Sequence, residues 1–176
     1  MNLKLKRTPG IYIVGFMGAG KTTIGRLLAE RVGWRFIDID DDIEAAAGAA
    51  ISDIFSARGE EEFRRIEAAA LRARVGEIER GCPTVVALGG GAFARDANRE
   101  LLEGNGISIW LDCPFATVER RVAQATHRPL ARDPEKFAAL YQLRRQAYSR
   151  AEVRISIESD DPAVAVDAIL RMPLFQ

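Results

Sequence analysis

The residues best suited to chemistry form a glycine-rich run that ends in a lysine and a threonine. Residues 15–22 read GFMGAGKT, a full match to G-x-x-x-x-G-K-[ST], between an apolar run and a helical pattern. Glycines there let the backbone curl around an anion, so that successive N–H groups and a helix start face a phosphate. We expect ATP phosphates here, with Lys21 at the β- and γ-phosphates and Thr22 toward Mg²⁺. The expected nucleotide contacts are Gly18, Ala19, Gly20, Lys21, Thr22 and Thr23.

Two aspartates lie two positions apart at the end of the second β-rich run. Residues 36–40 read FIDID, and alternation along a strand would point Asp38 and Asp40 to the same face. Two neighbouring carboxylates repel each other unless a cation or a donor-rich ligand lies between them. We therefore expect one of them to serve Mg²⁺ and the other a substrate hydroxyl. The alternative is that the acidic run caps the following helical turn, which we prefer for Asp41 and Asp42.

Two further features indicate a ligand. Gly89, Gly90 and Gly91 follow an apolar run, where consecutive glycines cost folding entropy and bury nothing, so close approach of a ligand explains them better. Arg64 lies near the start of a predicted helix, where the helix dipole disfavours cations, and it therefore needs a ligand or a partner. Glu67 is at the right spacing to be that partner, although the two could also form an ordinary surface pair.

Short β-rich runs alternate with helical segments along the chain. The predicted strands are 11–14, 35–39, 84–88, 107–111 and 153–157. The predicted helices are 21–32, 60–80, 95–103, 114–122, 134–149 and 162–171. This alternation predicts an α/β three-layer sandwich around a parallel sheet, with the site beyond the carboxyl ends of the strands. The segments 41–59 and 123–133 look irregular, and long connections of this kind often carry substrate sites and lids.

Composition restricts the possible functions and partners. The chain has 176 residues, 48% of them apolar, so we expect one domain, 1–176, with a core that needs no disulfides. Lys plus Arg and Asp plus Glu are both 25, which leaves no overall basic field for nucleic acid or anionic lipid. One histidine and two unpaired cysteines cannot build a typical zinc site. The first apolar run is too short for a signal or a membrane span, so we expect a cytoplasmic protein. We also expect a monomer that binds small molecules.

Taken together, these separated motifs resemble the shikimate kinases, a family of the nucleoside monophosphate kinase-like P-loop group. The similarity extends from about Ile11 to Leu170 and rests on VGFMGAGKTTIGRLLAE, FIDIDDDIE, ISDIFSARGEEEFRRIE, VALGGGA and THRPLA. It implies a P-loop NTPase fold with a five-stranded parallel sheet in the order 2-3-1-4-5 and a mobile lid at about 123–133. It also implies transfer of the γ-phosphoryl group of ATP to the 3-hydroxyl of shikimate, with Mg²⁺ as the cofactor.

The resemblance also assigns roles to residues around the acceptor. Asp38 would act toward the metal, and Asp40 would hold the shikimate hydroxyls and accept the proton. Arg64 would bind the shikimate carboxylate with support from Glu67, within a substrate-binding segment at about 41–70. The residues expected to line the ring or to bring backbone against it are Phe55, Phe63, Gly89, Gly90 and Gly91.

Three arginines complete the site that the resemblance implies. Arg128 of the lid would reach the phosphates, and Arg121 with the loop at 159–162 would contact adenine. The second carboxylate-binding arginine of the family precedes a tyrosine in the pattern R-x-P-L-Y. Residues 144–148 here read RRQAY, without the proline and the leucine. The spacing favours Arg144, and Arg145 remains the alternative.

Two other functions compete with this one. A related metabolite kinase such as a gluconate kinase would share the phosphate loop, but it has no need of a double-arginine carboxylate clamp beside three glycines. A non-catalytic nucleotide-binding module would be expected to have lost at least one catalytic residue. Lys21, Asp40, Arg64 and Arg128 are all present, which favours an active shikimate kinase over both alternatives.

Overall fold

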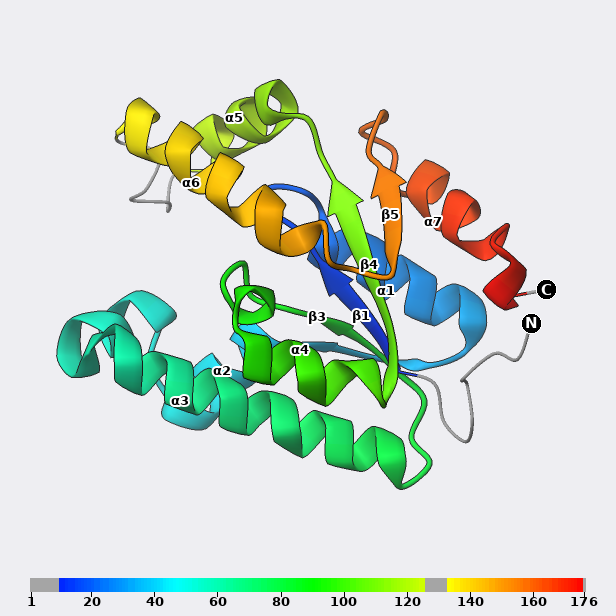
Figure 1. Ribbon diagram of the computed structural model, residues 1–176, viewed down its shortest axis with the longest axis horizontal. Coiled ribbons are helices and arrows are strands. Elements are labelled where there is room, and N and C mark those ends of the chain that lie inside the picture. Colours follow the sequence, from blue (N-terminus) through cyan, green and yellow to red (C-terminus); the bar gives the residue numbers. More distant parts are fainter. Residues whose placement is uncertain (1–9, 126–132, 176) are drawn as a thin grey trace.

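The computed structural model describes residues 10–125 and 133–175, and Figure 1 shows their arrangement. Within these ranges five parallel strands form one sheet in the order β2-β3-β1-β4-β5, which confirms the predicted order. The strands are β1 (Gly10–Val14), β2 (Arg35–Asp38), β3 (Thr84–Ala87), β4 (Gly106–Asp112) and β5 (Val153–Ser156). Strands β1 and β3 are buried along their whole length, as expected of inner parallel strands covered on both faces.

Helices cover both faces of the sheet. They are α1 (Lys21–Val32), α2 (Ile39–Ala47), α3 (Ile51–Glu79), α4 (Asp96–Glu103), α5 (Phe115–Gln124), α6 (Pro134–Tyr148) and α7 (Pro162–Leu170), with short 3-10 turns η1 (Ala92–Ala94) and η3 (Pro173–Phe175). On one face, α1 packs against α7 and against β1, β2 and β3. On the other face, the Tyr12 hydroxyl of β1 donates to the Asn105 carbonyl just after α4. The expected three-layer α/β sandwich is confirmed.

Local sequence signals explain how two of these helices start. Helices α6 and α7 both begin with an Asp-Pro pair, in which the aspartate side chain accepts a backbone N–H and the proline occupies the first helical position. Asp133 accepts from Lys136 N at 3.2 Å, and Asp161 accepts from Ala163 N at 2.9 Å. These caps fix the entry of each helix at the loops that surround the carboxyl ends of β4 and β5.

The expectation that 41–59 is irregular was wrong, because most of this segment is helical. Helix α2 ends at Ala47, with Gly48 as its C-cap, and α3 begins at Ile51. The Ile51 N–H donates to the Glu44 side chain at 2.9 Å. Ile43 and Ile54 are buried, so packing stabilises these short turns although glycines interrupt the helical pattern. Gly59 breaks the helical geometry inside α3, with φ 82° and ψ 168°, and the predicted helix 60–80 is the part after this kink.

The predicted lid at 123–133 is described only at its ends. Helix α5 continues to Gln124, so its first two residues are helical, and residues 126–132, including Arg128, lie outside the described ranges. None of the helices in the ranges that the structure covers combines the length and the apolar character needed to cross a membrane.

Candidate active site

The phosphate loop connects the buried strand β1 to helix α1. Gly18 and Gly20 have left-handed backbone angles, with φ of 80° and 94°, which side chains rarely adopt. Gly20 is the N-cap of α1 and offers no capping side chain, so the first turn of the helix keeps N–H groups for an anion. Lys21 folds back over the loop, where its Nζ donates to the carbonyls of Gly15 at 2.8 Å and Phe16 at 3.1 Å.

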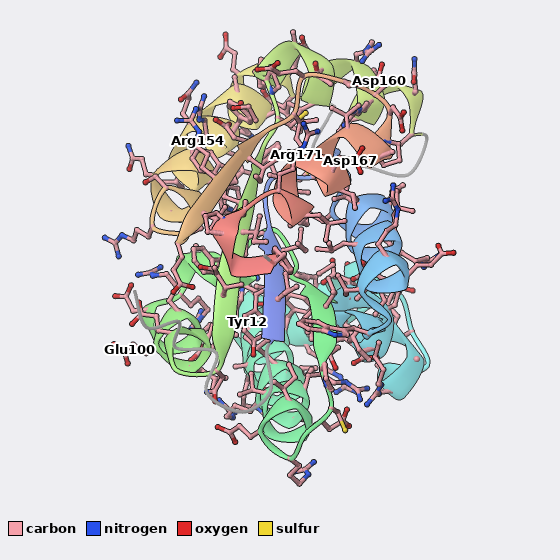
Figure 2. The ribbon with its side chains drawn as sticks, turned by 90° about the vertical axis from the view of Figure 1, so that its right-hand side faces the viewer. Tyr12, Glu100, Arg154, Asp160, Asp167 and Arg171 are labelled. Carbon is pink, nitrogen blue, oxygen red and sulfur yellow. The ribbon has the colours of Figure 1, made fainter. Side chains whose placement is uncertain are left out.

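A cavity of about 710 Å³ lies over this loop. All six predicted loop contacts line it, together with Asp38, Asp40 and Arg121. Arg121 donates to the Gly18 carbonyl at 2.9 Å and to Asp160 at 2.8 Å, so it bridges the phosphate loop and the loop after β5. Figure 2 shows Asp160 at the upper end of the molecule, close to α5. Ser159 and Pro162 of the same segment also line the cavity, at the place expected for adenine.

Asp38 connects the phosphate loop to helix α2. Its Oδ2 accepts from the Thr22 hydroxyl at 2.6 Å, and its Oδ1 caps α2 by accepting from Asp40 N at 3.0 Å. The expectation that both aspartates project from one strand face was wrong, because β2 ends at Asp38 and Asp40 lies in the first turn of α2. Capping therefore explains part of the acidic run, including Asp38. The two carboxylates still meet at the same cavity.

Asp40 lies in an environment that disfavours its charged form. Burial, and then the negative charge of Asp38, raise the pKa of the Asp40 carboxyl to about 6, while the positive charge of Lys21 acts in the opposite direction. A carboxyl with this pKa is mostly ionised at neutral pH, and as a base it is stronger than an exposed aspartate. Asp40 can therefore accept a proton from a bound hydroxyl.

A second cavity of about 240 Å³ adjoins the first. Arg64 lies in its wall and donates to Glu67 Oε2 at 2.8 Å, and the Glu67 side chain is only 1% exposed. The guanidinium also lies over the rings of Phe55 at 6.0 Å and Phe63 at 5.3 Å. An arginine fixed in this way keeps donors for a ligand carboxylate at low entropic cost. The surface-pair alternative for Arg64 and Glu67 was wrong, since the pair is buried in the cavity wall.

The run of three glycines forms the floor of the second cavity. A Cβ added at Gly89 would lie 2.7 Å from Asp40 Oδ1 and 3.0 Å from Glu67 Oε1, and one at Gly91 would lie 2.6 Å from Arg64 Nη1. The close approach expected from a ligand is thus made first by the protein's own charged side chains. Any other residue at Gly89 or Gly91 would displace the groups that define the cavity.

The structure distinguishes the two neighbouring arginines of α6. Arg144 lines the second cavity. Arg145 instead donates to Asp112 Oδ2 at 3.1 Å and lies over the rings of Trp110 and Tyr141. Of the two candidates for the second carboxylate-binding arginine, only Arg144 therefore lies where it could face Arg64 across a ligand.

Sequence reasoning missed a link between α6 and the glycine run. The Tyr148 hydroxyl donates to the Gly90 carbonyl at 2.5 Å, and the side chain is 1% exposed. Burial raises the pKa of this hydroxyl, so it remains protonated and available as a donor. The spacing of Arg144 and Tyr148 puts both side chains on one face of a helix, but it does not indicate the bond to Gly90. The hydrogen bond therefore ties the helix that carries Arg144 to the glycine run that lines the same cavity.

Replacing Tyr148 with Phe should therefore impair acceptor binding more than turnover. Loss of one buried hydrogen bond of about 1 kcal/mol corresponds to a rise of about fivefold in the KM for the acceptor, with kcat changed less. Tyr141→Phe is the matched control, because its hydroxyl donates from the same helix to the Cys113 carbonyl at 2.7 Å, outside the second cavity. Equal KM values for the two variants in steady-state assays would contradict the positioning role of Tyr148.

Comparison with known proteins agrees with this geometry. A family model described as "Shikimate kinase" matches residues 17–172. The chain is 42% identical over 161 residues to a shikimate kinase of Persephonella marina, covering 91% of this chain and 96% of the relative. It is 47% identical over 152 residues to a shikimate kinase of Symbiobacterium thermophilum, covering 82% and 84%. Among solved structures, a shikimate kinase of Acinetobacter baumannii in complex with shikimate has a TM-score of 0.85 at 35% identity, covering 95% and 93%.

Proposed function

Because the chain belongs to the shikimate kinase family, we propose that it transfers the γ-phosphoryl group of ATP to the 3-hydroxyl of shikimate, giving 3-phosphoshikimate and ADP. One observation supports this most directly. Asp40 and Gly90 lie in the walls of both cavities, so an acceptor in the smaller one is next to the phosphates in the larger one. Such a junction brings the two reactants into contact and turns a bimolecular encounter into an oriented one.

The smaller cavity suits a carboxylated ring. Arg64, fixed by Glu67, and Arg144 on α6 supply two guanidinium groups for the carboxylate, while Phe55 and Phe63 form an apolar wall. Their ring centroids are 4.5 Å apart, so the wall is continuous. Asp40 lies toward the phosphate loop and can accept hydrogen bonds from ring hydroxyls. The carboxylate and the reacting hydroxyl are thus held at opposite ends of the cavity.

Transfer needs mainly orientation and neutralisation of charge. Asp40 accepts the proton of the attacking hydroxyl, and Lys21 places positive charge at the β- and γ-phosphates. The N–H groups of the phosphate loop bind the same oxygens. Arg128, assigned by the family resemblance, adds positive charge at the transferring group.

The residues next to the phosphate loop also fit a magnesium ion. Thr22 and Asp38 offer hydroxyl and carboxylate oxygens, the hard donors that Mg²⁺ prefers. Thr22 Oγ1 and Asp38 Oδ2 lie 2.6 Å apart. When bound there, Mg²⁺ would neutralise charge on the β- and γ-oxygens.

Asp38→Asn should produce a magnesium-dependent defect. The substitution keeps the shape and removes a charge that the cation needs, so kcat/KM for ATP should fall at low Mg²⁺ and recover in part with excess Mg²⁺. A Mg²⁺ titration of both activity and ATP binding measures this. Asp41→Asn is the matched control, because it removes an equal charge three positions after Asp38 and outside both cavities. Its activity should depend on Mg²⁺ as that of the wild type does. An Asp38→Asn defect that is the same at all Mg²⁺ concentrations would exclude a role toward the metal.

Release of ADP with different acceptors tests the proposed function. Shikimate should stimulate ADP release strongly, whereas gluconate should not, because the two arginines and the phenyl rings are arranged for a ring carboxylate. Stimulation by gluconate alone would favour a sugar-acid kinase. No stimulation by either would favour a nucleotide-binding module. We further propose a cytoplasmic monomer, since ATP is a cytoplasmic metabolite and one chain supplies the described walls of both cavities.

A further inference from the structure

A third cavity, of about 350 Å³, lies outside the two already described. Residues of α4, of the preceding 3-10 turn and of α6 line it, together with Arg150 just after α6. Its charged lining residues are Asp96, Arg99, Arg144 and Arg150. Its volume is within the range of small-molecule sites, and neither the phosphate loop nor Asp40 takes part in it.

One arginine in the lining of this cavity, Arg99, is buried and held in place by neighbouring groups. The Arg99 side chain is only 8% exposed, donates to the Phe93 carbonyl at 2.9 Å and pairs with Asp96. Its guanidinium also lies over the Phe93 ring, 5.9 Å from the centroid. Two of its five N–H donors are used in these bonds, so others remain for a ligand. A buried, fixed arginine of this kind loses little entropy when it binds an anion.

The charges around the cavity do not balance. Arg99, Arg144 and Arg150 carry three positive charges, whereas Asp96 is the single acidic residue in the lining. Asp96 is already shared between Arg99 and Arg150, which lies 3.5 Å away. Within the described ranges, no hydrogen bond or ion pair joins the Arg144 side chain to another residue. A concave surface with an excess of guanidinium groups attracts anions.

Arg144 also lines the second cavity, together with Arg64 and the glycine run. One side chain thus forms part of the boundary between the second cavity and the third cavity. An anion on one side of this boundary competes with an anion on the other for the same guanidinium.

We propose that the third cavity binds a small molecule with two negative charges, a phosphate monoester or a dicarboxylate, and that its occupation draws Arg144 away from the shikimate carboxylate. Arg99 and Arg150 hold the dianion at one end, and Arg144 binds it at the other. The affinity for shikimate falls, while the phosphoryl transfer machinery is unchanged. The effect on shikimate rests on the proposed function, whereas binding of the dianion does not.

Kinetics test the coupling. The KM for shikimate is measured at saturating ATP, which keeps phosphate off the phosphate loop, with ionic strength held constant by chloride. Inorganic phosphate and malonate are added in separate series, so that the two kinds of dianion are told apart. In the wild type at least one of them should raise this KM severalfold and leave kcat unchanged.

The variant Arg150→Gln separates the third cavity from direct competition. The Arg150 side chain is 64% exposed and lies outside the other two cavities. The variant should therefore have normal turnover when no dianion is added. Loss of one charge-assisted contact should weaken the dianion effect about tenfold. Arg31→Gln, an exposed arginine of α1 paired with Asp167, removes the same charge on the other face of the sheet and should behave like the wild type.

Calorimetry with each dianion in saturating ADP gives a second readout that does not depend on activity. Binding should be present in the wild type and about tenfold weaker in Arg150→Gln. Equal effects on KM and equal binding in the two proteins would place the dianion in the shikimate cavity and overturn the proposal. Absence of binding to the wild type would overturn it as well. Normal dianion binding without shikimate-dependent ADP release would instead contradict the proposed function alone.

Discussion

Asp40→Asn should lower kcat by about 10² to 10⁴-fold, the range associated with a lost general base. The amide keeps the shape of the side chain but cannot accept the proton of the attacking hydroxyl. Shikimate binding should weaken, because ring hydroxyls lose a charged acceptor, while ATP binding should stay nearly intact. Excess Mg²⁺ should not restore activity, in contrast to Asp38→Asn. Separate titrations of ATP and shikimate, together with turnover, measure the three effects.

The pH dependence checks the same assignment. Because the pKa of Asp40 is raised to about 6, kcat/KM for shikimate in the wild type should fall as the pH drops through that value, and the residual activity of Asp40→Asn should lack this limb. A variant that binds shikimate and turns over like the wild type would show that Asp40 is not the acceptor of the proton. Asp38 or a bound water would then have to take its place.

The same substitution should stabilise the fold at alkaline pH. The folded pKa of Asp40, about 6, lies above its ordinary value of 3.8, so the ionised carboxylate opposes folding at neutral pH and above. Asp40→Asn should therefore gain on the order of 1 to 3 kcal/mol of unfolding free energy at pH 8. The gain should vanish as the pH falls through 6 toward 4, where the folded wild type has taken up its proton. Urea unfolding at both ends of this range measures the difference.

Lys21→Met should lower kcat by about 10² to 10³-fold, the loss typical of removing one group that stabilises charge in a transition state. Methionine keeps most of the apolar stem, so the change removes mainly the positive charge above the loop. The acid limb of the pH profile should also move to higher pH, because Lys21 lowers the pKa of Asp40. Turnover, ATP affinity and the pH profile are measured on the same variant.

Lys136→Met is the matched control for this change. Lys136 is 83% exposed on α6 and pairs with Asp133 at 3.4 Å, outside both ligand cavities. Its variant should keep wild-type turnover and the wild-type pH profile. A Lys21→Met variant that retained more than about a tenth of wild-type kcat would contradict this prediction. The charge of Lys21 would then contribute little to stabilising the transition state.

The parts of the site that depend on local sequence were predictable. The phosphate loop follows from a fixed spacing of glycines, a lysine and a threonine, and buried parallel strands follow from continuous apolar runs. The strand order was predictable only through the family resemblance. The segment before Gly59 was misjudged because glycines interrupt its helical pattern, whereas burial of Ile43 and Ile54 stabilises two helices there.

The parts that depend on contacts between distant segments were not predictable. Spacing allowed both Arg144 and Arg145, and only the position of Asp112 at the end of β4 determines which of them is bound away from the cavity. The bond from Tyr148 to Gly90 joins residues 58 positions apart. No local pattern encodes such a pair, since it depends on how α6 crosses the glycine run.

The position of the transferred phosphoryl group tests the proposed reaction most directly. The protein is incubated with ATP, Mg²⁺ and shikimate, and the product is examined by ³¹P nuclear magnetic resonance with correlation to the ring protons. We expect one new phosphate monoester signal, coupled to the proton on carbon 3 of shikimate and formed in equal amount to ADP. A phosphate ester on another hydroxyl, or ADP accompanied only by inorganic phosphate, would contradict the placement of the acceptor hydroxyl between Asp40 and the phosphate loop.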